Sequence, residues 1–355
     1  MNAREAIGAA ADWVRSIAAR IDGYAGAYLS GSALERAPEA EWPLDSDVDV
    51  VLVYDGPAPA KIGKLRWKGA LLEPTWMPKQ AFADFDGVMR THYLAWGLHG
   101  GCVLDDPQGW LRPLAERVAV EYLREDWLRA RVDAVAALAR RHIDGISSAQ
   151  SPEDRLMSCA FGPSCAAFPI LAAAGRNCTV RKRIPAARAV LAAQGRMDFA
   201  RRLEQGLGCE NMGRDELWRH MDALERAFDA AARTDGPSRT YPFRSDIRPE
   251  ARSVAIDGSR RMIEGDHPAD AVFWMMATFA RSLTVLRMDD AALYAAHLPA
   301  LQAFAAALGV DGPERALERQ RLARQILMES EQVAAEILSK TARRESGLQR
   351  APDVL

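Results

Sequence analysis

The stretch SDVDVVLVY, from Ser46 to Tyr54, predicts a β-strand over Val48–Tyr54 with acidic residues just before it and at its start. Its apolar part is rich in β-branched residues, which are favoured in strands. Successive side chains of a strand point to opposite faces, so Asp47 and Asp49 share one face. Val48 and Val50 share the other face. The strand therefore has one apolar face and places two carboxylates side by side on the opposite face.

Two carboxylates on one strand face need an explanation, because neighbouring like charges repel. A bound cation removes the repulsion, and Mg²⁺ takes carboxylate oxygens while leaving room for phosphate and water. The alternative is that Asp47 and Asp49 are strand-entry residues in a solvated turn. Asp45, two residues earlier on the same face, has no assigned role.

A Gly-Ser pair precedes this strand. The stretch AYLSGS, from Ala27 to Ser32, combines a short predicted strand with Gly31 and Ser32 at its end. Glycine lets the backbone approach a ligand closely, and backbone amides with a hydroxyl suit phosphate oxygens. The alternative is an ordinary turn. A strand, a Gly-Ser pair and a second strand that opens with Asp-x-Asp together favour a metal and phosphate site.

A third carboxylate, Glu73, lies in the stretch GALLEP, residues 69–74. We predict a single strand over Trp67–Met77 that ends at Pro74 or Pro78. If this strand neighbours the strand with the two aspartates, Glu73 reaches the same metal site. Taken alone, Glu73 is more simply a strand-end glutamate that faces water.

The bulk composition is typical of a soluble globular protein. The chain has 355 residues, of which 49% are hydrophobic and 26% charged, and its formal net charge is −2. No global basic field favours nucleic acid, so we do not expect a nucleic-acid partner. Five scattered cysteines without a CxxC pair fit reduced thiols and predict a cytoplasmic location. The charged, amphipathic N-terminal stretch is unlike a signal peptide, and we expect no membrane span of roughly 18 apolar residues.

The chain changes character after its first third. Short predicted strands and helices alternate before about Glu116, and Ala-, Leu- and Arg-rich segments with helical spacing follow it. We therefore predict an α+β fold, with a small mixed-sheet domain over residues 1–115 and an all-helical domain over residues 116–355. The expected elements include an N-terminal helix around residues 7–21, a strand in residues 100–106, and helices in residues 125–143, 213–234 and 318–338.

The succession of Gly-Ser, Asp-x-Asp and an acid on a later strand resembles the polymerase-β-like nucleotidyltransferase superfamily. The stretches that carry the resemblance are SGS at Ser30–Ser32, SDVDVVLV at Ser46–Val53, and Glu73 in LLEP. A small domain followed by a helical one is most similar to the bacterial aminoglycoside nucleotidyltransferases. One departure is the long segment between Ser32 and Asp47, which contains RAPEAEWP.

The resemblance implies a Mg²⁺-dependent transfer of a nucleoside monophosphate, AMP from ATP, to a hydroxyl of a small, aminoglycoside-like molecule. It implies that Asp47 and Asp49 hold Mg²⁺, and that Gly31 and Ser32 contact the triphosphate. Glu73 is then a third metal ligand or the general base. Metal ions that bridge the acids and the phosphates offset the charge that develops during in-line displacement at the α-phosphorus, and pyrophosphate leaves.

A basic stretch in the second predicted domain adds two candidate phosphate ligands. NCTVRKRIP, from Asn177 to Pro185, contains Arg181 and Arg183, which suit a clamp on the nucleotide phosphates. The simpler interpretation is a solvated helix end. Two other functions stay open for the whole chain: nucleotidyl transfer to a protein or tRNA, and a nucleotide-binding regulator without turnover.

Overall fold

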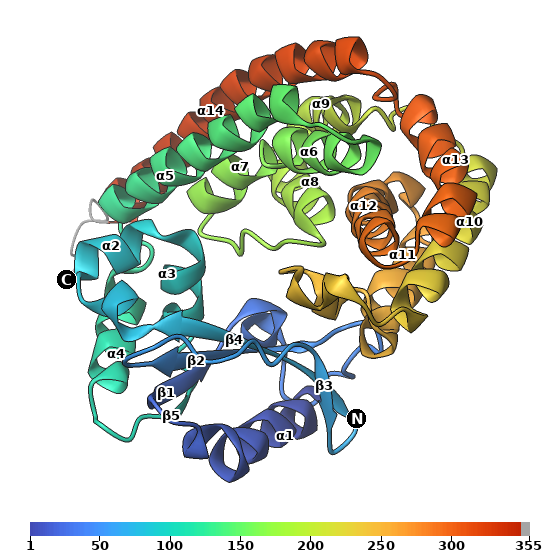
Figure 1. Cartoon of the computed structure of the whole chain (residues 1–355). Helices are drawn as coiled ribbons and strands as arrows, with labels where there is room; N and C mark the ends of the chain where they lie inside the picture. The colour runs from blue at the N-terminus through green and yellow to red at the C-terminus, as the bar shows by residue number, and fades with distance from the viewer. Residues whose placement is uncertain (349–355) are drawn as a thin grey trace.

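Five strands form a mixed sheet in the first third of the chain (Figure 1). The computed structural model describes the backbone of residues 1–348 and the side chains of residues 1–340. The strand order is β3-β4-β2-β1-β5, and β2 pairs in parallel with β4 while the other pairs are antiparallel. The strands are β1 (Tyr24–Leu29), β2 (Val48–Tyr54), β3 (Leu65–Trp67), β4 (Ala70–Pro78) and β5 (Val103–Asp105).

The strands expected around the acidic stretch and in residues 27–30 and 100–106 are confirmed as β2, β1 and β5. The single strand predicted over Trp67–Met77 is wrong, because this segment contains the turn of a hairpin. Lys68 and Gly69 both have positive φ, +47° and +85°, as a tight two-residue hairpin turn requires. The hairpin joins β3 to β4, and Trp67 pairs with Ala70 across it.

Pro74 does not end β4, contrary to the first of the two predicted stops. It lies inside the strand opposite Val50 of β2, and β4 continues to the second predicted stop at Pro78. Proline is tolerated in a strand where no hydrogen-bond partner needs its missing N–H. That condition holds at Pro74, because β3 pairs with β4 only from Ala70 to Leu72 and leaves this edge open.

Helices cover both faces of the sheet. Val48 and Val50 of β2 are buried in one apolar cluster with Ala6 and Trp13 of helix α1 (Ala3–Ser16). Val53 belongs to a second cluster, on the opposite face, with residues of the helices that precede and follow β5. Those helices are α2 (Phe85–Arg90), α3 (His92–His99) and α4 (Leu111–Glu121). The face that carries Asp47 and Asp49 is therefore turned away from α1.

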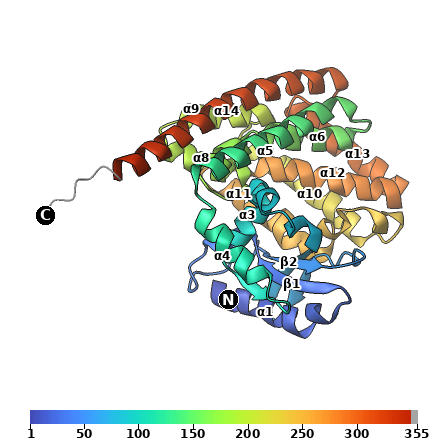
Figure 2. The ribbon, with the colours of Figure 1, turned by 90° about the vertical axis from the view of Figure 1, so that its left-hand side faces the viewer.

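The rest of the chain is mostly helical, which confirms an α+β fold with a mixed sheet followed by a helical region (Figure 2). The predicted boundary between residues 115 and 116 falls inside α4, whose buried residues pack with the sheet. The large helical core begins at Leu128. Its helices are α5 (Glu125–Asp144), α6 (Pro152–Ser164), α7 (Ala167–Ala173), α8 (Arg183–Ala193), α9 (Met197–Leu207), α10 (Arg214–Arg233), α11 (Gly258–Glu264), α12 (Val272–Asp289), α13 (Ala291–Ala307) and α14 (Pro313–Leu348).

One segment is more apolar than the sequence analysis expected. By length and composition Pro152–Ala173, which contains α6 and α7, is able to cross a membrane. In the fold, 83% of its apolar stretch is buried against other helices, as in the core helix of a globular domain. The expectation that no segment reaches this length and apolarity is therefore wrong, because the apolar residues needed for the helical core are concentrated here.

Candidate metal and nucleotide site

The parallel pairing of β2 and β4 brings the three predicted acids together. Asp49 of β2 lies directly opposite Glu73 of β4, and Asp47 immediately precedes β2 on the same face as Asp49. One carboxylate oxygen from each of the three residues lies within 4.8 Å of the others. The predicted convergence of Asp47, Asp49 and Glu73 is confirmed as geometry, and such a cluster of oxygens has the donor chemistry that Mg²⁺ prefers.

The Gly-Ser pair lies against the same acids. Gly31 has a φ of +63°, and a Cβ at this position would lie 1.7 Å from Oδ2 of Asp49. Only glycine therefore fits between the turn and the carboxylate. The backbone amide of Ser30 donates to the Asp49 carbonyl at 3.0 Å, which ties the turn to β2. The hydroxyl of Ser32 lies 3.4 Å from that of Ser46, next to Asp47.

A lysine that the sequence analysis missed completes the cluster. Lys64, whose side chain is 5% exposed, donates hydrogen bonds from Nζ to Asp47 Oδ2 and Glu73 Oε2. The hairpin explains its position: Leu65 pairs with Leu72, so the preceding Lys64 comes to lie beside Glu73. A hairpin turn at residues 68–69 is the sequence signal that places Lys64 beside Glu73. The prediction of one strand over residues 67–77 left this turn out.

The protonation of the cluster reflects an excess of negative charge. Burial, together with repulsion from Asp47, raises the pKa of Asp49 to about 7. Burial raises the pKa of Glu73 to about 8, with Lys64 opposing and the two aspartates adding to the rise. Burial also acts to raise the pKa of Asp47, but the charge and hydrogen bond of Lys64 outweigh it and lower that pKa. One ammonium thus does not neutralise three carboxylates.

The cluster fits a divalent cation by two features of this structure. Its oxygens converge within the reach of one ion, and a buried positive group already bridges two of the three carboxylates. Lys64 stands in for part of the charge that a cation would supply. Asp49 has no ammonium of its own, so Asp47 and Asp49 are the pair best placed to hold an added ion.

Asp45, which had no predicted role, joins the sheet to the helical region. It is 6% exposed, and its Oδ2 accepts a hydrogen bond from Nη1 of Arg181 at 3.0 Å. Nη2 of Arg181 donates to the Asp45 carbonyl at 2.8 Å, and Arg261 of α11 lies 3.1 Å from Oδ1. Burial acts to raise the pKa of Asp45, but the charge and hydrogen bond of Arg181, with the charges of Lys182 and Arg261, outweigh it and lower that pKa. Arg181 is also close enough to Asp49 to act on its pKa.

Arg183 is placed differently from Arg181. It is 2% exposed, and its guanidinium lies over the rings of Phe161, Phe168 and Phe273 inside the helical core. It also donates to the hydroxyl of Ser164 at 3.2 Å. Burial lowers the pKa of Arg183. The structure therefore brings Arg181 to the acidic cluster, and it places Arg183 where its hydrogen bonds and ring contacts are all with residues of the helical region.

Other cations gather near Arg181. Lys182 is exposed as a residue, but its ammonium is partly desolvated. This desolvation and then the charge of Arg181 lower the pKa of Lys182, with Arg36 and Arg261 adding to the effect. Asp45 is the acid that opposes this shift. Among the residues with described side chains, Lys182 forms no ion pair, and Nε of Arg36 is buried without a hydrogen-bond partner. Arg181, Lys182 and Arg261 surround Asp45, and Arg36 adds a fourth positive group near Lys182, so these four residues form a basic cluster.

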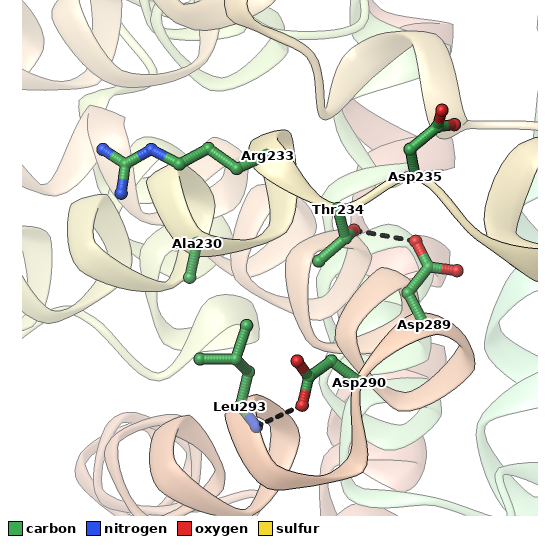
Figure 3. Close-up of a pocket in the computed structure, with 7 residues that line it drawn as sticks. All are labelled: Ala230, Arg233, Thr234, Asp235, Asp289, Asp290 and Leu293. Carbon is green, nitrogen blue, oxygen red and sulfur yellow. Dashed lines mark hydrogen bonds between the residues drawn. The ribbon is translucent and has the colours of Figure 1, made fainter.

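A separate pocket of about 460 Å³ lies between the end of α10 and the junction of α12 and α13 (Figure 3). Its acids have structural partners: Thr234 donates to Asp289 at 2.7 Å, and Asp290 accepts from the Leu293 amide at 2.9 Å as a helix cap. It contains none of the predicted site residues. The lining residues are Ala230, Arg233, Thr234, Asp235, Asp289, Asp290 and Leu293.

Within the part of the chain that the structure describes, the acidic cluster of Asp47, Asp49 and Glu73 is thus where the residues that the sequence singled out come together. Comparison of the whole chain with known proteins adds no relative: no family model, no curated protein and no solved structure matches it.

Proposed function

We propose that the protein is a Mg²⁺-dependent nucleotidyltransferase that moves a nucleoside monophosphate, AMP from ATP, to a hydroxyl of a small molecule. The observation that supports it most is the convergence of Asp47, Asp49 and Glu73 within 4.8 Å, with Gly31 packed against Asp49. A metal site with a close backbone turn beside it is the arrangement that a triphosphate requires.

In this proposal, each part of the cluster has a separate task. Asp47 and Asp49 would hold Mg²⁺, which would supply positive charge against the negative charge of the triphosphate. Glu73 takes the proton of the acceptor hydroxyl, and burial raises its pKa, which strengthens it as a base. Lys64 holds the Glu73 carboxylate in place through its hydrogen bond.

The basic cluster supplies the phosphate contacts. Arg181 is fixed by Asp45 and faces the cluster, while Lys182 and Arg36 have positive groups without acidic partners. Charged hydrogen-bond donors of this kind bind phosphate oxygens strongly. Arg181, Lys182, Arg36 and the turn at Gly31 and Ser32 therefore contact the triphosphate in this proposal, and Arg183 does not.

The test is incubation with Mg²⁺, each of the four nucleoside triphosphates labelled at the α-phosphate, and a panel of acceptors. The panel contains aminoglycosides, mixed proteins and tRNA, and both pyrophosphate release and the labelled product are followed. We expect release with ATP and a small hydroxylated acceptor. Label on protein or tRNA alone would refute the small-molecule acceptor, and nucleotide binding without release would favour a regulator.

Two substitutions connect the activity to the site. Asp47→Asn and Asp49→Asn are each expected to lower pyrophosphate release about 100-fold or more, the size typical for loss of one preorganised charged group. Asp55→Asn is the matched control, because Asp55 follows the same strand but its side chain is 64% exposed and pairs with Lys79. Full activity in either of the first two variants would contradict the mechanism.

A further inference from the structure

The position of Lys64 has a consequence for the number of metal ions. Asp47 belongs to two pairs: its carboxylate lies within 4.8 Å of that of Asp49, and its Oδ2 accepts the hydrogen bond from Lys64, which also bonds Glu73. Three carboxylates in this arrangement offer two cation positions, one between Asp47 and Asp49 and one between Asp47 and Glu73. In enzymes with two metal ions, such positions lie about 3.5–4 Å apart. Here the ammonium of Lys64 already lies in the second position.

The backbone around Lys64 keeps the ammonium there. On its C-terminal side, β3 begins at Leu65 and is paired with β4. On its N-terminal side, the connector is held by the helical region: Lys61 donates to the carbonyl of Pro242, and a Cβ on Gly63 would lie 2.9 Å from the Cβ of Ser245. A lysine whose side chain is 5% exposed, and whose neighbouring backbone is contacted on both sides, is held against the two carboxylates.

We propose that Lys64 is a resident cation that permanently fills the position between Asp47 and Glu73, so that the protein takes one divalent ion fewer than its carboxylates allow. The remaining ion binds between Asp47 and Asp49. The identity of the bound nucleotide in this inference rests on the proposed function. The role of Lys64 is tested separately, by comparing the number of bound metal ions in the unmodified protein and in Lys64→Met.

The experiment counts bound Mn²⁺ from the electron paramagnetic resonance signal of the free ion. Each protein is saturated with an ATP analogue that has a non-hydrolysable α,β-methylene link. Lys64→Met removes the ammonium at nearly the same side-chain length and is expected to bind one more Mn²⁺ per chain than the unmodified protein. Lys61→Met is the control, since it removes a charge from the same connector without contact to the acids, and it is expected to leave the count unchanged.

A second variant excludes a general effect of lost positive charge. Lys64→Met combined with Glu73→Gln removes the second cation position itself and is expected to return the count to that of the unmodified protein. Equal counts in the unmodified protein and in Lys64→Met overturn the inference. An unmodified protein that binds no Mn²⁺ with the analogue contradicts the proposed function, while the difference between the two forms still decides the role of Lys64.

A measurement on the unmodified protein covers the case in which Lys64→Met does not fold. Acetylation of lysines followed by mass spectrometry shows which lysine side chains are accessible to the reagent. Lys64 is expected to stay protected before and after addition of Mn²⁺ and the analogue, with exposed Lys61 as the reactive reference in the same peptide region. A rise in Lys64 acetylation on addition of Mn²⁺ and the analogue would show that the ion displaces the lysine, and would overturn the inference.

Discussion

Gly31 and Asp49 share a space too small for a side chain on residue 31. A Cβ there would lie 1.7 Å from the Asp49 carboxylate oxygen, and φ of residue 31 is +63°. Two effects of a substitution are therefore combined at one position: backbone strain and displacement of a carboxylate. They can be separated, because Gly101 has nearly the same φ, +64°, with no atom within 4 Å of its would-be Cβ.

We expect Gly31→Ala and Gly101→Ala each to lower the free energy of unfolding by about 1–2 kcal/mol, the strain of alanine in a left-handed conformation. Gly31→Ala is also expected to weaken Mn²⁺ binding at least about 10-fold, because Asp49 must move. Chemical denaturation and Mn²⁺ titration of both variants measure the two effects. Unchanged Mn²⁺ affinity in Gly31→Ala would remove Asp49 from the site.

The raised pKa values of Asp49 and Glu73, about 7 and about 8, make the stability of the metal-free protein depend on pH. In the unfolded chain both groups titrate near pH 4, so from about pH 5 to about pH 8 the folded state binds more protons. The free energy of unfolding therefore falls as pH rises through this range. Asp47, whose pKa is lowered, is already ionised there.

Thermal unfolding in a chelator between about pH 6.5 and pH 8.5 checks this expectation. The lower limit avoids histidines such as His92, whose pKa burial lowers to about 4 and whose effect has the opposite sign below about pH 6.5. Asp49→Asn combined with Glu73→Gln should flatten the profile. A profile of the unmodified protein that is flat or rises over this range would be inconsistent with two carboxyls of raised pKa.

At the scale of elements, the sequence was most informative where one pattern determines one structure. The β-branched run from Val48 to Tyr54 is a strand with the predicted bounds, and its period of two placed Asp47 and Asp49 on one face. The hairpin at residues 68–69 was missed because Lys68 occupies a left-handed position that glycine and asparagine usually take. Missing the hairpin also meant missing Lys64.

Contacts between distant elements could not be predicted from local patterns. Arg181 and Arg183 lie two residues apart and look equivalent in the sequence, yet one bonds Asp45 of the sheet region and the other is buried under phenylalanine rings. That difference depends on how the segment before α8 packs on both regions. Asp45 likewise acquires its role through two arginines far along the chain, Arg181, 136 residues later, and Arg261.

Helix α11 holds Arg181 in place through Gly258. A Cβ on Gly258 would lie 2.2 Å from Nη1 of Arg181 and 3.1 Å from Oδ2 of Asp45. Because residue 258 has ordinary helical φ, alanine brings no backbone strain there. We expect Gly258→Ala to lower nucleotide affinity about 10-fold, the cost of one weakened charged contact, without a large loss of stability.

Titration with the nucleotide analogue and thermal unfolding measure these two quantities. The matched control is Gly145→Ala, at a residue with φ −66° and open space around its would-be Cβ. It is expected to leave nucleotide affinity unchanged. Equal affinities for Gly258→Ala and the unmodified protein would mean that Arg181 makes no contact with the nucleotide.

At the scale of the whole molecule, polar contacts beside the acidic cluster join the sheet region to the helical region. Asp45 bonds Arg181 and Arg261, and Glu35 pairs with Arg176 at 3.0 Å. The residues that form these contacts belong to the same parts of the sheet region and the helical region that contact the triphosphate in the proposed function. The placement of the two regions and the geometry of the site are therefore coupled.

Loss of the buried Asp45 carboxylate tests that coupling. Asp45→Ala leaves Arg181 with an uncompensated buried charge and is expected to cost about 3 kcal/mol of the free energy of unfolding. Asp235→Ala is the control, since Asp235 pairs with Arg239 on the surface, and it is expected to cost below about 1 kcal/mol. Equal losses in denaturant titrations of the two variants would show that Asp45 is not a structural tie.

The central claim, a divalent cation between Asp47 and Asp49, is tested most directly by anomalous diffraction. Crystals of the protein with Mn²⁺ and the α,β-methylene analogue of ATP would be measured near the manganese absorption edge. We expect one anomalous peak within bonding distance of Asp47, Asp49 and the nucleotide phosphates, with Lys64 still between Asp47 and Glu73. Bound nucleotide with no manganese at these two aspartates, at saturating Mn²⁺, would contradict it.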